Sequence, residues 1–165
     1  MKPVSLLAFV LLGSAAWAET TGHAHHHDHS AGHDRRAMHA AVPDGREPVE
    51  FPPRLKEETL ANMRDHLLAI QEITALLADK RFDTAADVAE IRLGMTSLQR
   101  HGAHEVAQYM PSGMRQIGHG MHQAASRFAT AAKDAGVTGD TGAALRALAT
   151  MQSGCVACHA AYRFK

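Results

Sequence analysis

The feature that most constrains this chain is a Cys-x-x-Cys-His sequence near its end, at residues 155–159. Cys155 and Cys158 are the only cysteines among the 165 residues, and His159 follows them directly. On a helix, residues three and four positions apart share a face, so both sulfurs and the imidazole would point the same way. This spacing is typical of haem c attachment, in which two thioethers hold one porphyrin and the histidine binds its iron.

Two other uses of the cysteine pair fit the sequence less well. A structural zinc site needs further strong ligands at matching spacing, and the chain has no second Cys-x-x-Cys. A thioredoxin-like redox pair begins a helix that follows a strand, whereas this pair lies near the end of an expected helix. The sequence therefore predicts one covalently attached haem c as the cofactor.

Residues 1–18 are predicted to be a secretory signal peptide. Lys2 supplies the positive start, an apolar segment continues to Ala15, and Ala16-Trp17-Ala18 forms a cleavage site of the A-x-A type. The apolar segment is too short to span a membrane, which takes about 20 residues. We therefore expect cleavage after Ala18 and an exported protein that does not span the membrane.

The charge of the chain is balanced, with 17 basic and 17 acidic residues. Loss of Lys2 with the signal peptide leaves a formal charge of −1. A nucleic-acid-binding protein would carry a strong basic excess, so the composition argues against nucleic acid as a partner.

Residues 19–50 are predicted to be a disordered, histidine-rich tether. Large apolar residues are almost absent there, so the segment cannot bury enough surface to fold alone. Neutral imidazoles also suit Zn²⁺, Cu²⁺ and Ni²⁺, and such binding would weaken below about pH 6.5 as the histidines protonate. A solvated tether and a metal-binding tail are both open interpretations. The candidate metal-binding histidines of this tail are His23, His25, His26, His27, His29 and His33.

Residues 51–165 are predicted to form one helical domain. Four stretches carry apolar residues with the 3.6-residue period of an amphipathic helix, and none shows sustained alternation. The expected helices cover residues 54–79, 83–102, 111–135 and 140–162, with a longer connection at 101–113. Short connections at the first and third joints favour an all-α fold, an antiparallel four-helix bundle enclosing the haem.

The last expected helix ends in the pattern Cys-x-x-Cys-His-x-x-Tyr-Arg, from Cys155 to Arg163. In its sequence and its place at the C-terminus, this pattern resembles the class II c-type cytochromes, the cytochrome c-prime family. The resemblance extends over residues 54–165 and is specific in the haem motif, while along the first three helices it is mainly one of pattern. It implies an up-down-up-down bundle, a periplasmic location and a position for Arg163 near the proximal face of the haem. Dimers are common in that family, so a homodimer is also open.

The sixth coordination position of the iron is expected to face the first helix. In the family that the chain resembles, this position meets an apolar residue in five-coordinate proteins or a methionine in the low-spin electron-transfer branch. Counting back from Phe82-Asp83, which looks like the start of that family's second helix, places Met63 there, and the apolar periodicity also points Met63 inward. A plain core role for Met63 and iron ligation by His66 are the alternatives.

Three functions are open on this basis. The first is a non-enzymatic electron carrier, in which the iron cycles between Fe(III) and Fe(II) under His159 and Met63 and periplasmic redox proteins are the partners. The second is a five-coordinate haem protein that binds NO or CO. The third is a metal-buffering protein that acts through its histidine-rich tail.

Several histidines outside the tail are further metal-ligand candidates. His101, His104 and Glu105 lie close together in the long connection, and His119 and His122 are spaced i, i+3 on one expected helix. Neither group has a complete set of identified ligands, so solvated or hydrogen-bonded histidines are the simpler interpretation.

Overall fold

The computed structural model of the chain describes residues 43–165. About 77% of them are helical, in five α-helices with little strand, so the predicted all-α class is confirmed at that level. Within this part of the chain, no helix combines the length and the apolar character needed to cross a membrane. The predicted signal peptide and the six candidate histidines between positions 23 and 33 lie outside the described residues.

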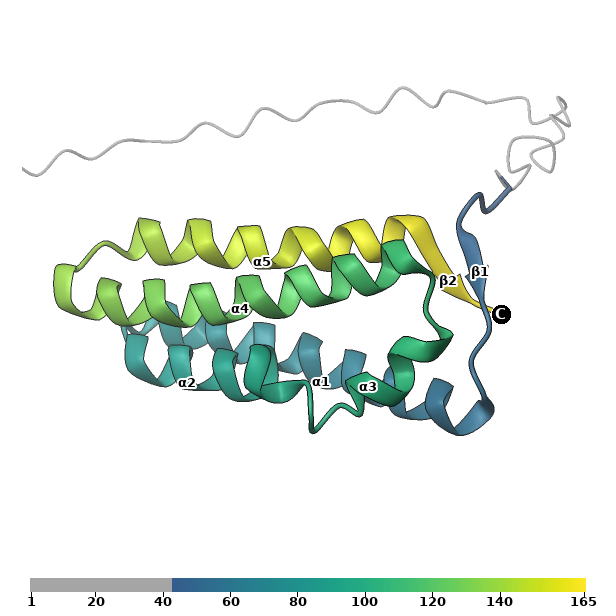
Figure 1. Cartoon of the computed structure of the whole chain (residues 1–165). Coiled ribbons are helices and arrows are strands. Elements are labelled where there is room, and N and C mark those ends of the chain that lie inside the picture. The colour runs from purple at the N-terminus through teal and green to yellow at the C-terminus, as the bar shows by residue number, and fades with distance from the viewer. Residues whose placement is uncertain (1–42) are drawn as a thin grey trace, which may run out of the picture. The chain divides into compact units, whose positions relative to one another are not determined.

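Four helices make up most of the described chain, and they pack side by side (Figure 1). Helix α4 lies along α5, α2 lies against α4, and α1 lies against α2. Between α2 and α4 the chain forms a short α3 and two 3₁₀ turns, η2 and η3. The bounds are α1 Pro53–Ala78, α2 Phe82–Arg92, η2 Met95–Ser97, α3 Ala103–Val106, η3 Ala107–Tyr109, α4 Ser112–Thr138 and α5 Thr141–Ala161.

Local signals in the sequence fix the ends of three helices. Pro53 opens α1, where its fixed φ and missing N–H cost nothing. Helix α4 ends at Thr138, and Gly139 follows it with a φ of +79°, the left-handed conformation that glycine adopts without strain. Asp140 then caps α5, because its Oδ1 accepts a hydrogen bond of 2.9 Å from the Ala143 N–H.

The core is divided into two clusters. The main cluster joins α1, α2, α4 and α5, and Ile73, Phe128 and Met151 are fully buried in it. A smaller cluster near the C-terminal end of α5 contains Val49, Phe51, Leu55, Val106 and Met114. The 3.6-residue period also places Leu67, Ile91 and Leu145 on the apolar faces of their helices, but these side chains are exposed, at 70%, 49% and 48% respectively.

The second helix is shorter than predicted. It was expected to reach residue 102, but α2 ends at Arg92, and Gly94 has an extended backbone. The Thr96 hydroxyl donates to the Glu90 carbonyl at 2.7 Å, and the Ser97 hydroxyl donates to the Gly94 carbonyl at 2.7 Å. Such side-chain bonds to the backbone compete with helix, which explains the early end.

The described chain also contains a strand pair that was not predicted. Strand β1 (Glu47–Val49) pairs in parallel with β2 (Tyr162–Phe164), so that Pro48 lies opposite Arg163. Figure 1 places this pair at the end of α5 opposite the α4–α5 turn. The disordered tether was predicted to reach residue 50, and for residues 43–50 this is wrong. The cause is local, because Val49 and Phe51 are 4% and 6% exposed and anchor this segment in the smaller cluster.

Candidate functional site

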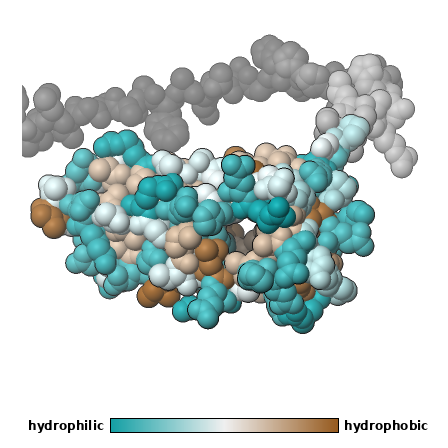
Figure 2. Space-filling model, in the orientation of Figure 1, coloured by the Kyte–Doolittle hydropathy of each residue, from teal (hydrophilic) through white to brown (hydrophobic). Residues whose placement is uncertain are grey.

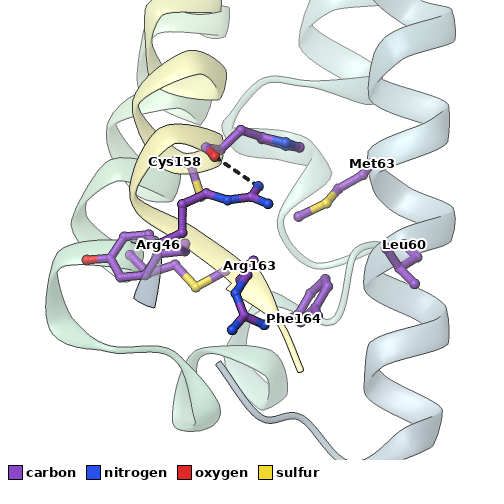
Figure 3. A pocket seen from close by; sticks show the side chains of 9 residues that line it. Arg46, Leu60, Met63, Cys158, Arg163 and Phe164 are labelled. Atoms are coloured by element: carbon purple, nitrogen blue, oxygen red, sulfur yellow. Dashed lines mark hydrogen bonds between the residues drawn. The ribbon is translucent and has the colours of Figure 1, made fainter. Parts of the chain in front are cut away.

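A cavity of about 440 Å³ opens between α1, the α2–α4 connection, α4 and the C-terminal half of α5. Figure 2 shows the surface hollowed between these elements. We call it the main cavity, and its volume is within the range of about 300–1,000 Å³ that is usual for small-molecule and cofactor sites. A side cavity of about 180 Å³ adjoins it toward the strand pair (Figure 3). Met63, Met114, Cys158 and His159 border both cavities.

The three residues of the haem motif, Cys155, Cys158 and His159, all lie on α5 and line the main cavity. Both cysteines are free and partly buried, and burial raises the pKa of each thiol above its ordinary value. Cys155 packs against the main core cluster and Cys158 against the smaller one. His159 is exposed at the rim of the cavity. The motif therefore presents two sulfurs and one imidazole to a single cavity, as its helical spacing predicts.

Helix α5 approaches α4 closely just before the motif. A Cβ atom added at Gly154 would lie 2.8 Å from the Cβ of Met121 and 3.4 Å from its Cα. Only glycine allows this contact without a shift of one helix. Because Cys155 is the next residue, this contact between α4 and α5 also positions Cys155 in the wall of the main cavity.

Met63 reaches the motif from the opposite wall. It lies on α1, is partly buried and borders both cavities. In Figure 3 its side chain points from α1 across the side cavity toward the part of α5 that carries Cys158. The candidate ligand predicted from the first helix thus faces the same space as the haem motif, while His66 lies further along the wall of the main cavity.

Arg163 lies on β2 and lines the side cavity together with His159. Its Nε is 3.4 Å from Asp44 Oδ2 and has no hydrogen-bond partner, so this contact is an ion pair without hydrogen-bond alignment. Arg46 also lines this cavity, and it donates to the His159 carbonyl at 3.3 Å (Figure 3). Hydrogen bonds from Arg46 lower the pKa of Asp44 to about 2. Asp44 and Arg46, which were predicted to lie in the tether, therefore contact the motif.

Three histidines that the sequence did not group together meet at the far side of the main cavity. We call His66 of α1, His101 of the α2–α4 connection and His122 of α4 the histidine trio. Their ring centroids are 4.9 Å apart for the first two, and that of His122 lies 5.8 and 5.9 Å from them. His66 Nε2 and His101 Nδ1 are 3.4 Å apart. All three side chains line the main cavity.

Burial favours the neutral form of all three imidazoles. Desolvation lowers the pKa of His66 to about 4, and it lowers the pKa of His101 and of His122 as well. His122 Nδ1 lies 2.7 Å from the Leu93 carbonyl oxygen. A carbonyl oxygen only accepts, so Nδ1 carries the proton and Nε2 keeps a free lone pair.

The two histidine groups considered in the sequence are not assembled. Glu105 forms an ion pair with Arg54 instead, and His104 is exposed. On α4, His119 is exposed beside Gln123, whereas His122 is buried. Within residues 43–165 as the structure places them, no group of three or more His, Cys, Asp or Glu side chains is arranged so that it could hold a metal ion.

The trio was missed because its members are far apart in the sequence, and the 3.6-residue period cannot connect different elements. One signal in the sequence could have pointed to His66. It lies at the edge of the apolar face of the first helix, three positions after the predicted ligand Met63, so its side chain was placed near the interior.

Comparison with models of known protein families, with curated proteins and with solved structures finds no match to this chain. A function must therefore be inferred from the residues around the two cavities.

Proposed function

We propose that this protein is a periplasmic haem c protein that carries single electrons between redox partners. The observation that supports the proposal best is the shared border of Cys155, Cys158, His159 and Met63 on one apolar cavity. When bound there, the haem supplies an iron centre that alternates between Fe(III) and Fe(II). In the same proposal, α1, α2, α4 and α5 form an antiparallel four-helix bundle that encloses the group.

The residues present fit a covalent haem. Both thiols are free, and the imidazole follows them on the same helix. The cavity wall includes Leu67 and Val156, apolar side chains that are 70% and 68% exposed. Apolar surface of this extent around one cavity is typical of a binding site that a hydrophobic ligand covers.

A buried hydroxyl also favours a bound group. Thr59 lines the main cavity at 7% exposure, and its Oγ1 has no hydrogen-bond partner. Buried polar atoms nearly always have a partner, so an unpaired hydroxyl on a cavity wall indicates a ligand with an accepting or donating atom.

Each residue of the site has a distinct task in this proposal. Cys155 and Cys158 attach the haem, so that it stays in place in both oxidation states. With a haem bound, His159 on α5 and Met63 on α1 would be the two side chains that hold its iron. Retention of the same two ligands in both oxidation states would favour one-electron transfer. Arg163 and Arg46, beside His159, place positive charge at the rim, where a redox partner would dock.

The visible spectrum of the protein, produced in a host that attaches haem c, tests this function. We expect a low-spin spectrum with a weak sulfur-to-iron band, and we expect Met63→Ala to abolish that band. His66→Gln is the matched control, since His66 lies one turn further along α1 and should leave the band unchanged.

Two outcomes would contradict the proposal. A high-spin spectrum that Met63→Ala does not alter would exclude the electron carrier with a methionine ligand and favour binding of NO or CO. A colourless protein whose mass equals that of the bare polypeptide would exclude the haem altogether. Cys155→Ser with Cys158→Ser supplies the reference for that mass.

A further inference from the structure

We propose that the histidine trio, His66, His101 and His122, binds one divalent transition-metal cation of the Zn²⁺ or Cu²⁺ class in the wall of the main cavity. This site is separate from the haem ligands His159 and Met63, and it uses none of the histidines of the tail. The observation behind it is the meeting of three imidazoles from three different elements at one end of the cavity.

The spacing of the rings is close to that of a metal site. Two imidazole nitrogens bound to one tetrahedral zinc at about 2.0–2.1 Å lie about 3.4 Å apart. His66 Nε2 and His101 Nδ1 are 3.4 Å apart. A cation placed between them would replace their mutual hydrogen bond with two bonds to metal.

His122 supplies the third nitrogen after a small movement. In a tetrahedral three-histidine site the ring centres lie about 5 Å apart, and the His122 centroid is 5.8 and 5.9 Å from the other two. Its ring must therefore move inward by under about 1 Å to complete the set. This explains why the trio does not yet form a closed ligand set.

The surroundings of His122 prepare it for this role. The Leu93 carbonyl accepts a hydrogen bond of 2.7 Å from His122 Nδ1, and the Ser97 hydroxyl lies 3.4 Å from the same atom. A metal-binding histidine usually donates its second N–H to a fixed acceptor in this way, which orients the ring and leaves Nε2 for the metal.

The charges that act on the trio are mixed, so the preference for a cation comes from the imidazoles themselves. Asp65 acts on His66 and His101, and it pairs with Arg92. Positive charge from Arg92 acts on His66, and positive charge from Arg100 acts on His101. Imidazole ligands suit zinc, copper and nickel and are not the choice of Mg²⁺ or Ca²⁺. A fourth position would be open to water from the cavity, as in zinc sites that have three protein ligands.

Zinc binding to the full mature chain with its haem tests the proposal. Because the tail would also bind zinc, all seven of its histidines, His39 included, are first replaced by glutamine. Competition with a chromophoric chelator should then show one Zn²⁺ per chain. His66→Gln, His101→Gln and His122→Gln should each weaken binding at least about 10-fold. The exposed pair His104→Gln and His119→Gln are matched controls and should not change the affinity.

X-ray absorption at the zinc edge gives a second, independent measurement. We expect about three imidazole ligands at about 2.0–2.1 Å. His101→Gln is the key variant, because His101 lies in a connection and is only partly buried, so its replacement should not disturb folding. Zinc surrounded mainly by oxygen, or trio variants that bind as tightly as the parent, would overturn the proposal.

The haem spectrum, recorded on the same samples, separates this proposal from the proposed function. His101→Gln and His122→Gln should bind zinc at least about 10-fold more weakly and keep the haem spectrum. If His66→Gln instead changes the low-spin spectrum, His66 is an iron ligand and the three-histidine site is wrong. If the haem is absent while zinc still binds to the trio, only the electron-carrier function fails.

Discussion

Gly154 lies one position before the first haem-motif cysteine, and its replacement by alanine should destabilise the protein. Elsewhere in a helix the same change is favourable, because alanine forms helix better than glycine by about 1 kcal/mol. At Gly154 the new Cβ would lie 2.8 Å from the Cβ of Met121 and 3.2 Å from its Cγ. The Cβ of Met121 cannot turn aside, so α4 and α5 must move apart.

The size of the effect follows from comparison with a second glycine. Overpacking of this kind costs about 1–3 kcal/mol. Gly120, on α4, has no heavy atom within 4 Å of an added Cβ. Gly120→Ala should therefore stabilise the protein by about 1 kcal/mol. Both variants share the gain in helix propensity, so Gly154→Ala should be less stable than Gly120→Ala by about 1–3 kcal/mol.

Equilibrium unfolding in urea, followed by far-UV circular dichroism, measures both free energies of unfolding. Equal slopes against urea would show that the variants unfold to similar states, so that the midpoints can be compared. Equal stabilisation by the two substitutions would refute the reasoning, since it would mean that α5 does not approach α4 as closely as the contact at Gly154 implies.

Two further predictions concern single carboxylates. Asp140→Ala should lower the free energy of unfolding by about 1 kcal/mol through loss of the α5 cap, while Asp140→Asn should keep most of it; an unchanged urea midpoint for the alanine variant would contradict the cap. The pKa of Asp44 is about 2 against an ordinary 3.8, because Arg46 binds the carboxylate. This ion pair should stabilise the fold above about pH 3.8 and lose its effect as the pH falls toward 2. A carboxyl NMR titration of Asp44 with a midpoint near 3.8 would contradict it.

Helix period and capping signals sufficed to place α1, α4 and α5 to within a few residues. They failed at α2, where Thr96 and Ser97 bind backbone carbonyls and end the helix near Gly94. The apolar period indicates which face of a helix is buried, but it does not show where side-chain hydrogen bonds to the backbone end the helix. It also could not show that Phe51 anchors a strand against the end of the chain, because that contact joins residues more than 110 positions apart.

In the candidate site, too, the residues that depend on local sequence could be predicted, and those that depend on the packing of distant elements could not. The haem motif is local in sequence, and its placement on one cavity follows from helical spacing alone. Met63 could be selected as a candidate from the sequence because its helix is regular and its apolar face follows the helical period. The histidine trio depends on where the α2–α4 connection returns His101 to α1, and that path follows from the early end of α2. Its members therefore emerge only when the elements are assembled.

The division of the core into two clusters gives the proposed cofactor a structural role. Cys155 packs against the main cluster and Cys158 against the smaller one, and the main cavity borders both cysteines. A group attached to both sulfurs would therefore bury apolar surface on each side and join the two clusters into one core. Burial stabilises the folded state by roughly 25 cal/mol per Å² of apolar surface. A haem that covered the exposed side chains of Leu67 and Val156 would therefore raise the free energy of unfolding. In the proposed function, attachment of the haem would therefore also complete the apolar core around the main cavity.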